Sequence, residues 1–151
     1  MILRILFEMV NKVSRQVYEV LELVEKEKSR PKQIKLLQDY STGALKDVLR
    51  GAYDDLVQWN LPSGTPPFEP APAENPPSSL YRQHLKFKYF VKGLVGDQMS
   101  PPKREKIFID MLESVHPKDA EVLCLMKDKK QLGKGITKKL VQEAFPKLIV
   151  K

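Results

Sequence analysis

Hydrophobic residues recur at three- and four-residue intervals along most of the chain, which is the spacing of one face of an α-helix. The first stripe has seven members, namely Leu3, Leu6, Val10, Val13, Val17, Val20 and Val24. Pro31 removes a backbone donor and disfavours helical geometry in the residue before it. The stripe therefore predicts one long N-terminal helix that ends near Lys28 or Ser29.

The same spacing continues on both sides of a proline-rich stretch. It predicts two short helices between Pro31 and Tyr53. Further helices are expected over residues 80–95, after a cap at Ser100, from Pro117 and after a cap at Thr137. Because no segment alternates convincingly between apolar and polar residues, no strand is expected, and the fold class is all-α.

The proline-rich stretch separates the two sets of helices. Residues 61–77 contain seven of the 12 prolines, which favour extended backbone on the surface. Trp59, Leu61 and Phe68 are apolar anchors that flexible linkers seldom carry, so an ordered strap is expected. A chain of 151 residues fits one domain, a helical bundle with N-terminal helices in 1–60, the strap in 61–79 and basic C-terminal helices in 80–151.

Few residues suggest chemistry. His84, His116 and the single cysteine, Cys124, share no metal-ligand spacing, so neither a metal site nor a cofactor is expected. Glycines at 133 and 135 precede a predicted helix but lack the spacing of a phosphate-binding loop. No nucleophile with a base can be identified, and no apolar run is long enough to cross a membrane. The sequence thus predicts a protein that is not an enzyme and does not span a membrane.

Charge is the strongest functional signal. The net charge is +7, and residues 81–151 carry 16 Lys and Arg against eight Asp and Glu, whereas residues 1–80 carry 10 against 11. Nine cations near predicted helix ends are candidate phosphate contacts, although lysines there also complement the helix dipole whatever the partner. They are Lys103, Arg104, Lys106, Lys127, Lys129, Lys130, Lys134, Lys138 and Lys139.

A second interpretation is a protein-binding adaptor or inhibitor. Tyr53, Trp59 and Phe68 would then be anchors for a partner protein. The alternative for these aromatics is burial in the core, where they would only fasten the strap.

Three sequence blocks resemble a family of small proteins of unknown function encoded by T4-like tailed phages. The blocks are residues 50–68, 103–130 and 134–146, and the resemblance covers about residues 32–148. It implies expression in the cytoplasm of an infected bacterium and supplies no catalytic residue. The expected function is therefore that of a non-enzymatic accessory protein that associates with nucleic acid, or else an adaptor, an inhibitor or a virion component. The sequence leaves the oligomeric state open.

Overall fold

The structure is a computed structural model that describes residues 15–149. This part of the chain forms α-helices connected by turns and by irregular segments, and its only β-pairing is an isolated bridge between Trp59 and Val91. The all-α prediction is therefore confirmed for the described residues. The α-helices are α2 (Val17–Lys26), α3 (Arg30–Asp39), α4 (Gly43–Tyr53), α5 (Leu80–Gln83), α6 (Pro101–Leu112), α7 (Pro117–Lys127) and α8 (Lys138–Ala144), and the 3₁₀ helices are η1 (His84–Tyr89) and η2 (Val95–Gln98).

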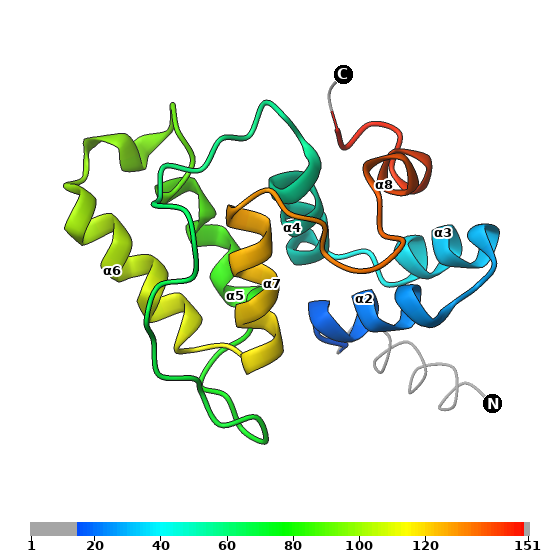
Figure 1. Ribbon diagram of the computed structural model, residues 1–151, viewed down its shortest axis with the longest axis horizontal. Coiled ribbons are helices and arrows are strands. Elements are labelled where there is room, and N and C mark those ends of the chain that lie inside the picture. Colours follow the sequence, from blue (N-terminus) through cyan, green and yellow to red (C-terminus); the bar gives the residue numbers. More distant parts are fainter. Residues whose placement is uncertain (1–14, 150–151) are drawn as a thin grey trace, which may run out of the picture.

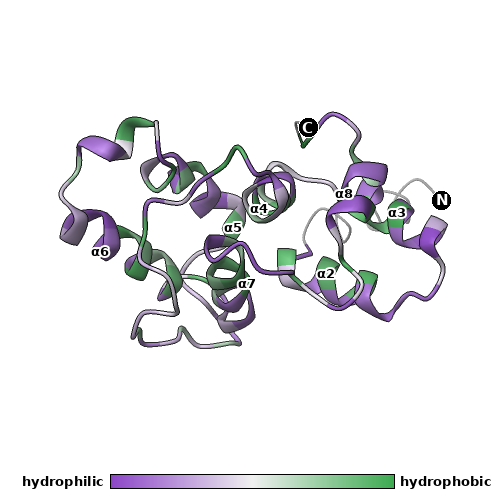
Figure 2. Ribbon diagram, turned by 45° about the horizontal axis from the view of Figure 1, so that its top comes forward, coloured by the Kyte–Doolittle hydropathy of each residue, from purple (hydrophilic) through white to green (hydrophobic). Residues whose placement is uncertain are grey.

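The helices pack around α4 and α7 in the middle of the molecule (Figure 1). α5 and η1 pack against α4, α6 packs against α7, and α3 lies between α2 and α8. α2 and α3 carry both hydrophobic and hydrophilic positions along their length (Figure 2), as expected for helices with one buried face. One hydrophobic cluster has members in every described α-helix, and fully burying each leucine in it contributes about 1.5–3 kcal/mol.

The predicted long N-terminal helix does not run through Gln16. Residues 1–14 lie outside the described residues, but Gln16 has extended backbone angles, so α2 begins only at Val17. Two carboxylates fix this start. The amide of Gln16 donates to Glu19 Oε1 at 3.0 Å, and the amide of Tyr18 donates to Asp119 Oδ1, from the first turn of α7, at 2.9 Å. A helix running through Gln16 was the wrong prediction because these side chains stabilise a helix terminus there.

The helix predicted over residues 80–95 is also shorter than expected. Regular α-helix covers only α5, and η1 continues it as 3₁₀ helix. The chain beyond η1 pairs with the segment after α4, since the amide of Asn60 donates to the Phe90 carbonyl at 2.6 Å and that of Lys92 to Gln58 at 2.8 Å. Gly93 then turns with φ of 89°, which other residues seldom adopt.

Residues 61–79 contain no helix and are fixed to α6 and α7 at several points. The amide of Gly64 donates to the Asp128 carboxylate, and the amide of Glu69 donates to the Glu113 carboxylate at 2.7 Å. Near the end of the segment, the amide of Ser78 donates to the Ser114 carbonyl at 2.7 Å. The segment is therefore held in place by hydrogen bonds as well as by its apolar side chains.

Candidate functional site

Arg104 is one of the two predicted phosphate contacts that are buried. Its residue exposure is 6%, and its guanidinium donates to the carbonyls of Asn60 at 2.8 Å and of Gly96 and Met99 at 3.0 Å. These bonds tie α6 to the start of the proline-rich segment and to η2. Arg104 therefore serves the fold and does not face a polyanion.

Lys127 is likewise turned inward. It is buried, and its ammonium donates to the carbonyls of Pro62 and Gly64, both at 2.8 Å, and to Asp128 Oδ1 at 2.7 Å. Its role is to hold the proline-rich segment on α7.

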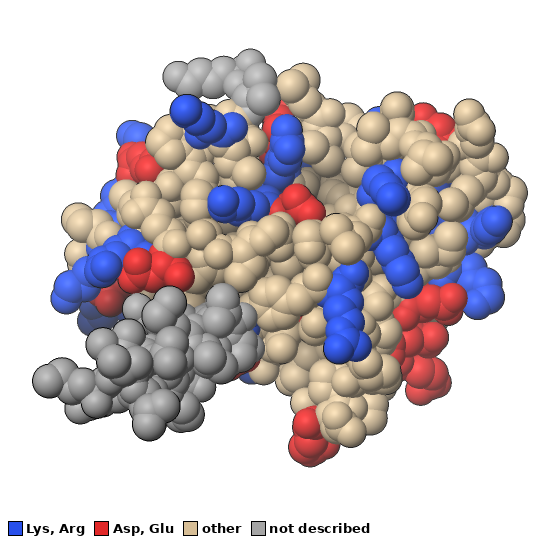
Figure 3. Space-filling model, turned by 180° about the vertical axis from the view of Figure 1, so that it is seen from behind, with Lys and Arg blue, Asp and Glu red and all other residues tan. Residues whose placement is uncertain are grey.

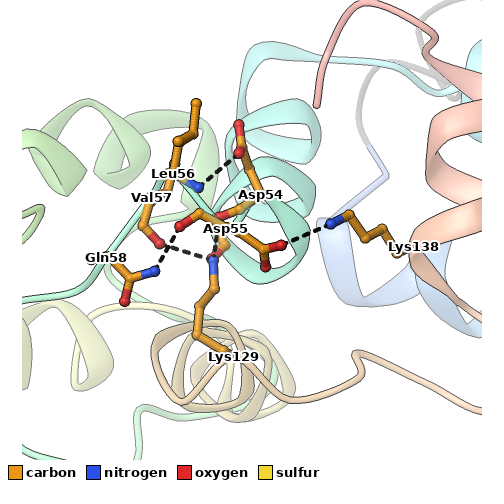
Figure 4. Close-up of polar contacts among 8 residues, drawn as sticks. Asp54, Asp55, Leu56, Val57, Gln58, Lys129 and Lys138 are labelled. Carbon is orange, nitrogen blue, oxygen red and sulfur yellow. Dashed lines mark hydrogen bonds and ion pairs between the residues drawn. The ribbon is translucent and has the colours of Figure 1, made fainter. Parts of the chain in front are cut away.

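Lys129 closes the C-terminal end of α4 (Figure 4). Its backbone is left-handed, with φ of 58°, and its ammonium donates to the carbonyls of Gly51 at 2.8 Å, Asp54 at 2.7 Å and Val57 at 2.9 Å. Burial lowers the pKa of Lys129, and the nearby carboxylates of Asp54 and Asp55 oppose that shift. The ammonium thus satisfies carbonyls that a helix end leaves without donors.

The other six predicted contacts are exposed or half-buried, and two of them have carboxylate partners. Lys106 Nζ lies 3.1 Å from Asp110, and Lys138 Nζ lies 3.0 Å from Asp55. The remaining four are exposed and have no carboxylate within 4.0 Å among residues 15–149; they are Lys103, Lys130, Lys134 and Lys139.

The four exposed lysines do not share one surface. α6 and α8, which carry Lys103 and Lys139, lie at opposite ends of the molecule (Figure 1). Figure 3 shows Lys and Arg in separate groups among other residues on the face that it draws. In the glycine turn after α7, the amide of Lys134 donates to Glu25 Oε1 at 2.6 Å, so a protein carboxylate occupies this amide. The nine predicted cations therefore do not gather into one patch.

The three predicted aromatic anchors are engaged inside the protein. The Tyr53 hydroxyl donates to the Ile136 carbonyl and accepts from the Leu132 amide at 3.0 Å, and burial raises the pKa of Tyr53. Trp59 donates from Nε1 to the Gly51 carbonyl at 2.9 Å. Phe68 is half-buried against the core. The alternative of burial in the core therefore describes Tyr53 and Trp59, and Phe68 is half-buried.

A groove missed by the sequence analysis lies beside Trp59. Among residues 15–149 the exposed large hydrophobic side chains are Leu56, Leu85, Leu94 and Val95, at 70%, 67%, 49% and 58% exposure. The first three line one open groove of about 480 Å³, together with the buried rings of Trp59 and Phe87. The ring centroids are 5.8 Å apart in an edge-to-face arrangement. Hydrophobic side chains from three separate segments thus converge at this groove.

Local hydrogen bonds explain how the leucines reach the surface. After α4 the amide of Leu56 donates to Asp54 Oδ1 at 3.0 Å, which forms a tight turn. In Figure 4 the Leu56 side chain points away from Lys129. Leu85 lies on η1, and the turn at Gly93 precedes Leu94. Sequence periodicity placed Leu85 and Leu94 on one α-helix, whereas Leu85 lies on a 3₁₀ helix and Leu94 in a turn.

The groove is lined by ionisable groups of both signs. Asp47 Oδ2 lies 2.6 Å from His84 Nδ1, and Asp54 is buried. Arg50 is half exposed, with its Nε 3.6 Å from Asp54, and Lys88 is exposed above the Tyr89 ring at 5.5 Å. Asp47 is therefore paired with His84 although its side chain is 44% exposed, Arg50 is paired with Asp54 but half exposed, and Lys88 has no carboxylate within 4.0 Å among residues 15–149.

No group of three His, Cys, Asp or Glu side chains in residues 15–149 could hold a metal ion. His116 caps α7 through Nδ1, which accepts from the Lys118 amide at 3.0 Å. Cys124 is buried, and burial raises its pKa, which disfavours the reactive thiolate. None of the helices in the described range is long and apolar enough to cross a membrane.

The fold and the groove define an all-α protein with an open apolar surface between α4 and η1. The chain belongs to a family of unknown function, DUF6433, whose model matches residues 20–134. The matched range contains every residue that lines the groove. No curated protein matches the chain.

Proposed function

We propose that this chain is a non-enzymatic protein-binding adaptor or inhibitor and that the groove between α4 and η1 is its docking surface. The convergence of Leu56, Leu85 and Leu94 at one groove carries this proposal. Scattered surface leucines are ordinary, but apolar side chains gathered around a concave surface are typical of interaction sites. Burying these side chains against a partner would supply about 25 cal/mol for each Å² of apolar surface removed from water.

The surroundings of the groove favour docking without large rearrangement. Trp59 is fixed by its hydrogen bond to Gly51, and the Lys129 ammonium holds the chain on either side of Leu56 through the Asp54 and Val57 carbonyls. A surface that is already ordered loses less conformational entropy on binding.

The resemblance to proteins of T4-like tailed phages supplies the setting of the proposal. We place the protein in the cytoplasm of an infected bacterium, where the partner is a host or phage protein. Assembly into the virion remains a distinct role, which would show as copies of the chain in purified particles.

Affinity capture from infected cells tests the docking function. Wild type is compared with Leu56→Ser/Leu85→Ser and with a control, Lys103→Ser/Lys139→Ser, which also changes two exposed side chains. Each sample is split and one half is treated with nuclease. The proposal expects partner proteins that resist nuclease, are retained by the control and are lost with the groove variant. Recovery that is unaffected by the leucine changes would contradict it.

A second candidate is sequence-tolerant nucleic-acid association through the four exposed lysines without carboxylate partners among the described residues. The logarithm of the affinity should fall with that of the salt concentration with a slope of about −0.9 for each phosphate contact that Lys103, Lys130, Lys134 or Lys139 makes with the same duplex DNA. Replacing all four with Ser should abolish the salt dependence of binding to a duplex oligonucleotide. Binding that is independent of salt, or that survives these changes, would rule out this electrostatic function.

A further inference from the structure

We infer that the groove binds an acidic amphipathic helix of the partner, with apolar side chains between Leu56, Leu85 and Leu94 and carboxylates facing Arg50 and Lys88. The inference rests on the proposed function and adds the chemistry of the partner to it.

The charge of the partner follows from which ionisable groups the groove leaves accessible. Asp47 is engaged by His84 at 2.6 Å, and Asp54 is buried and accepts the Leu56 amide at 3.0 Å. Arg50 and Lys88 are the cations that line the groove, and both extend into solvent. A partner with carboxylates beside its apolar face gains an ion pair with Lys88 and shares Arg50 with the buried Asp54, whereas a basic partner meets two like charges.

The amphipathic form follows from the positions of the leucines. Leu56 comes from the turn after α4, Leu85 from η1 and Leu94 from the turn after Gly93, so the apolar rim surrounds the groove on more than one side. Helices that dock in such grooves insert side chains spaced at i, i+3 or i+4, and i+7. A volume of about 480 Å³ lies within the range of pockets that hold several apolar groups.

Other occupants fit less well. A second copy of the chain would bring another strongly basic molecule, with a net charge of +7, to a groove with accessible cations. Single-stranded nucleic acid binds through exposed aromatic faces on which bases stack. Here Trp59 and Phe87 are only 7% and 6% exposed, so neither ring offers a stacking surface.

Trp59 provides a local probe, because it is the only tryptophan and lines the groove. The full chain is titrated with a tryptophan-free helical peptide that has Leu at i, i+3, i+4 and i+7 and Glu at the flanking positions. Trp59 emission and the anisotropy of a dye on the peptide are recorded together. The comparison peptides replace every Glu with Lys, or shuffle the leucines off the single face.

The acidic peptide is expected to bind saturably and to change Trp59 emission, and the lysine and shuffled peptides to bind at least about fivefold more weakly. Arg50→Glu/Lys88→Glu should weaken binding of the acidic peptide about fivefold or more, since exposed ion pairs contribute about 0.2–1 kcal/mol each and reversal adds repulsion. The matched charge reversal Lys103→Glu/Lys139→Glu should change binding less than twofold, since α6 and α8 supply no lining residue.

Equal binding of the acidic and lysine peptides would overturn the inference, as would displacement of the acidic peptide by single-stranded DNA. A dimer in sedimentation equilibrium that Leu85→Ser dissociates would identify a second copy as the occupant and would also overturn it. If the acidic peptide fails to bind while capture from cells still depends on Leu56 and Leu85, the inference alone fails. If capture is independent of these leucines, the proposed function fails.

Discussion

The two sides of the segment that follows α4 reverse the usual distribution of residues. On one side, the buried Lys127 and the half-buried Lys129 direct their ammonium groups to backbone carbonyls. On the other side, Leu56, Leu85 and Leu94 are exposed around a groove. Cations serve the interior here, and hydrophobic side chains face the solvent.

The reversal has a physical cause on the interior side. Helix ends leave carbonyls without donors, and prolines contribute carbonyls but no amide hydrogen. The α4 end and the proline-rich segment lie together, so several such carbonyls require donors, and Lys127, Lys129 and Arg104 supply them. Among the described residues, no unpaired polar group of this kind explains why the three leucines are exposed. The comparison therefore assigns these three cations to stability and leaves the leucines available for the proposed docking.

Arg104→Met gives the largest test of the interior side. It leaves the Asn60, Gly96 and Met99 carbonyls without the guanidinium donor, which should lower the free energy of unfolding by about 3–5 kcal/mol. Urea denaturation followed by circular dichroism measures the loss. The neighbouring change Lys103→Met removes an exposed cation and should stay within about 0.5 kcal/mol of wild type. Equal effects of the two substitutions would contradict the division of roles.

Asp119 is a buried ionisable group that, unlike Lys127, has no partner of opposite sign within ion-pair distance among the described residues. It is fully buried, its Oδ2 accepts no hydrogen bond within residues 15–149, and burial raises its pKa to about 7. Between pH 4 and 7 the folded chain therefore keeps a proton here that the unfolded chain has released. Ionisation of this group accordingly lowers stability as the pH rises across that interval.

Asp119→Asn should remove this pH-dependent cost and keep an acceptor for the Tyr18 amide. Each pH unit between the two pKa values is worth up to about 1.4 kcal/mol, so the variant should be more stable than wild type by about 3 kcal/mol at pH 8. Its advantage should disappear near pH 4. Urea titrations of both chains at each pH measure the difference, and a difference that does not change with pH would refute the assignment.

Sequence periodicity predicted the elements whose ends carry local signals. The Thr137 hydroxyl caps α8 by accepting from the Leu140 amide at 3.2 Å, and α6 and α7 begin with proline after Ser100 and His116, as expected. It failed at Gln16 and over residues 84–95, where the deciding hydrogen bonds come from Asp119 and from the segment after α4. Such contacts join residues far apart in the chain, so periodicity does not contain them.

The candidate site was harder to predict than the fold. A count of charges does not distinguish Lys129 from Lys130. In the structure the Lys129 ammonium donates to three carbonyls, whereas Lys130 is exposed. Leu85 and Leu94 looked like members of a buried helical face. Only the change from α-helix to 3₁₀ helix and the turn at Gly93 place them beside Leu56.

A comparison of Lys129→Met with Lys130→Met tests, in two neighbouring residues, whether the inward-facing cations stabilise the fold and the exposed ones do not. The first change removes the ammonium donor from three carbonyls, of which Gly51 keeps the Trp59 indole and Asp54 keeps the Val57 amide, and should cost about 2 kcal/mol of unfolding free energy. The second should change stability by less than about 0.5 kcal/mol. Methionine preserves the unbranched apolar stem, so thermal and urea unfolding report the loss of the ammonium. A loss of similar size in both variants would mean that the hydrogen bonds of Lys129 do not stabilise the chain.

Leu56→Ser/Leu85→Ser should have the smallest effect on stability, because side chains that are 70% and 67% exposed have little apolar contact to lose. The free energy of unfolding should remain within about 0.5–1 kcal/mol of wild type for the pair. The matched interior change, Leu45→Ser, alters a residue that is 1% exposed and should destabilise by at least about 3 kcal/mol. If Leu56→Ser/Leu85→Ser were as destabilising as Leu45→Ser, the two leucines would be core residues. The groove would then not be a free binding surface. If the pair keeps the stability of wild type but loses partner capture, the leucines contribute to binding and not to folding. The inward-facing cations and the exposed leucines then have separate energetic roles.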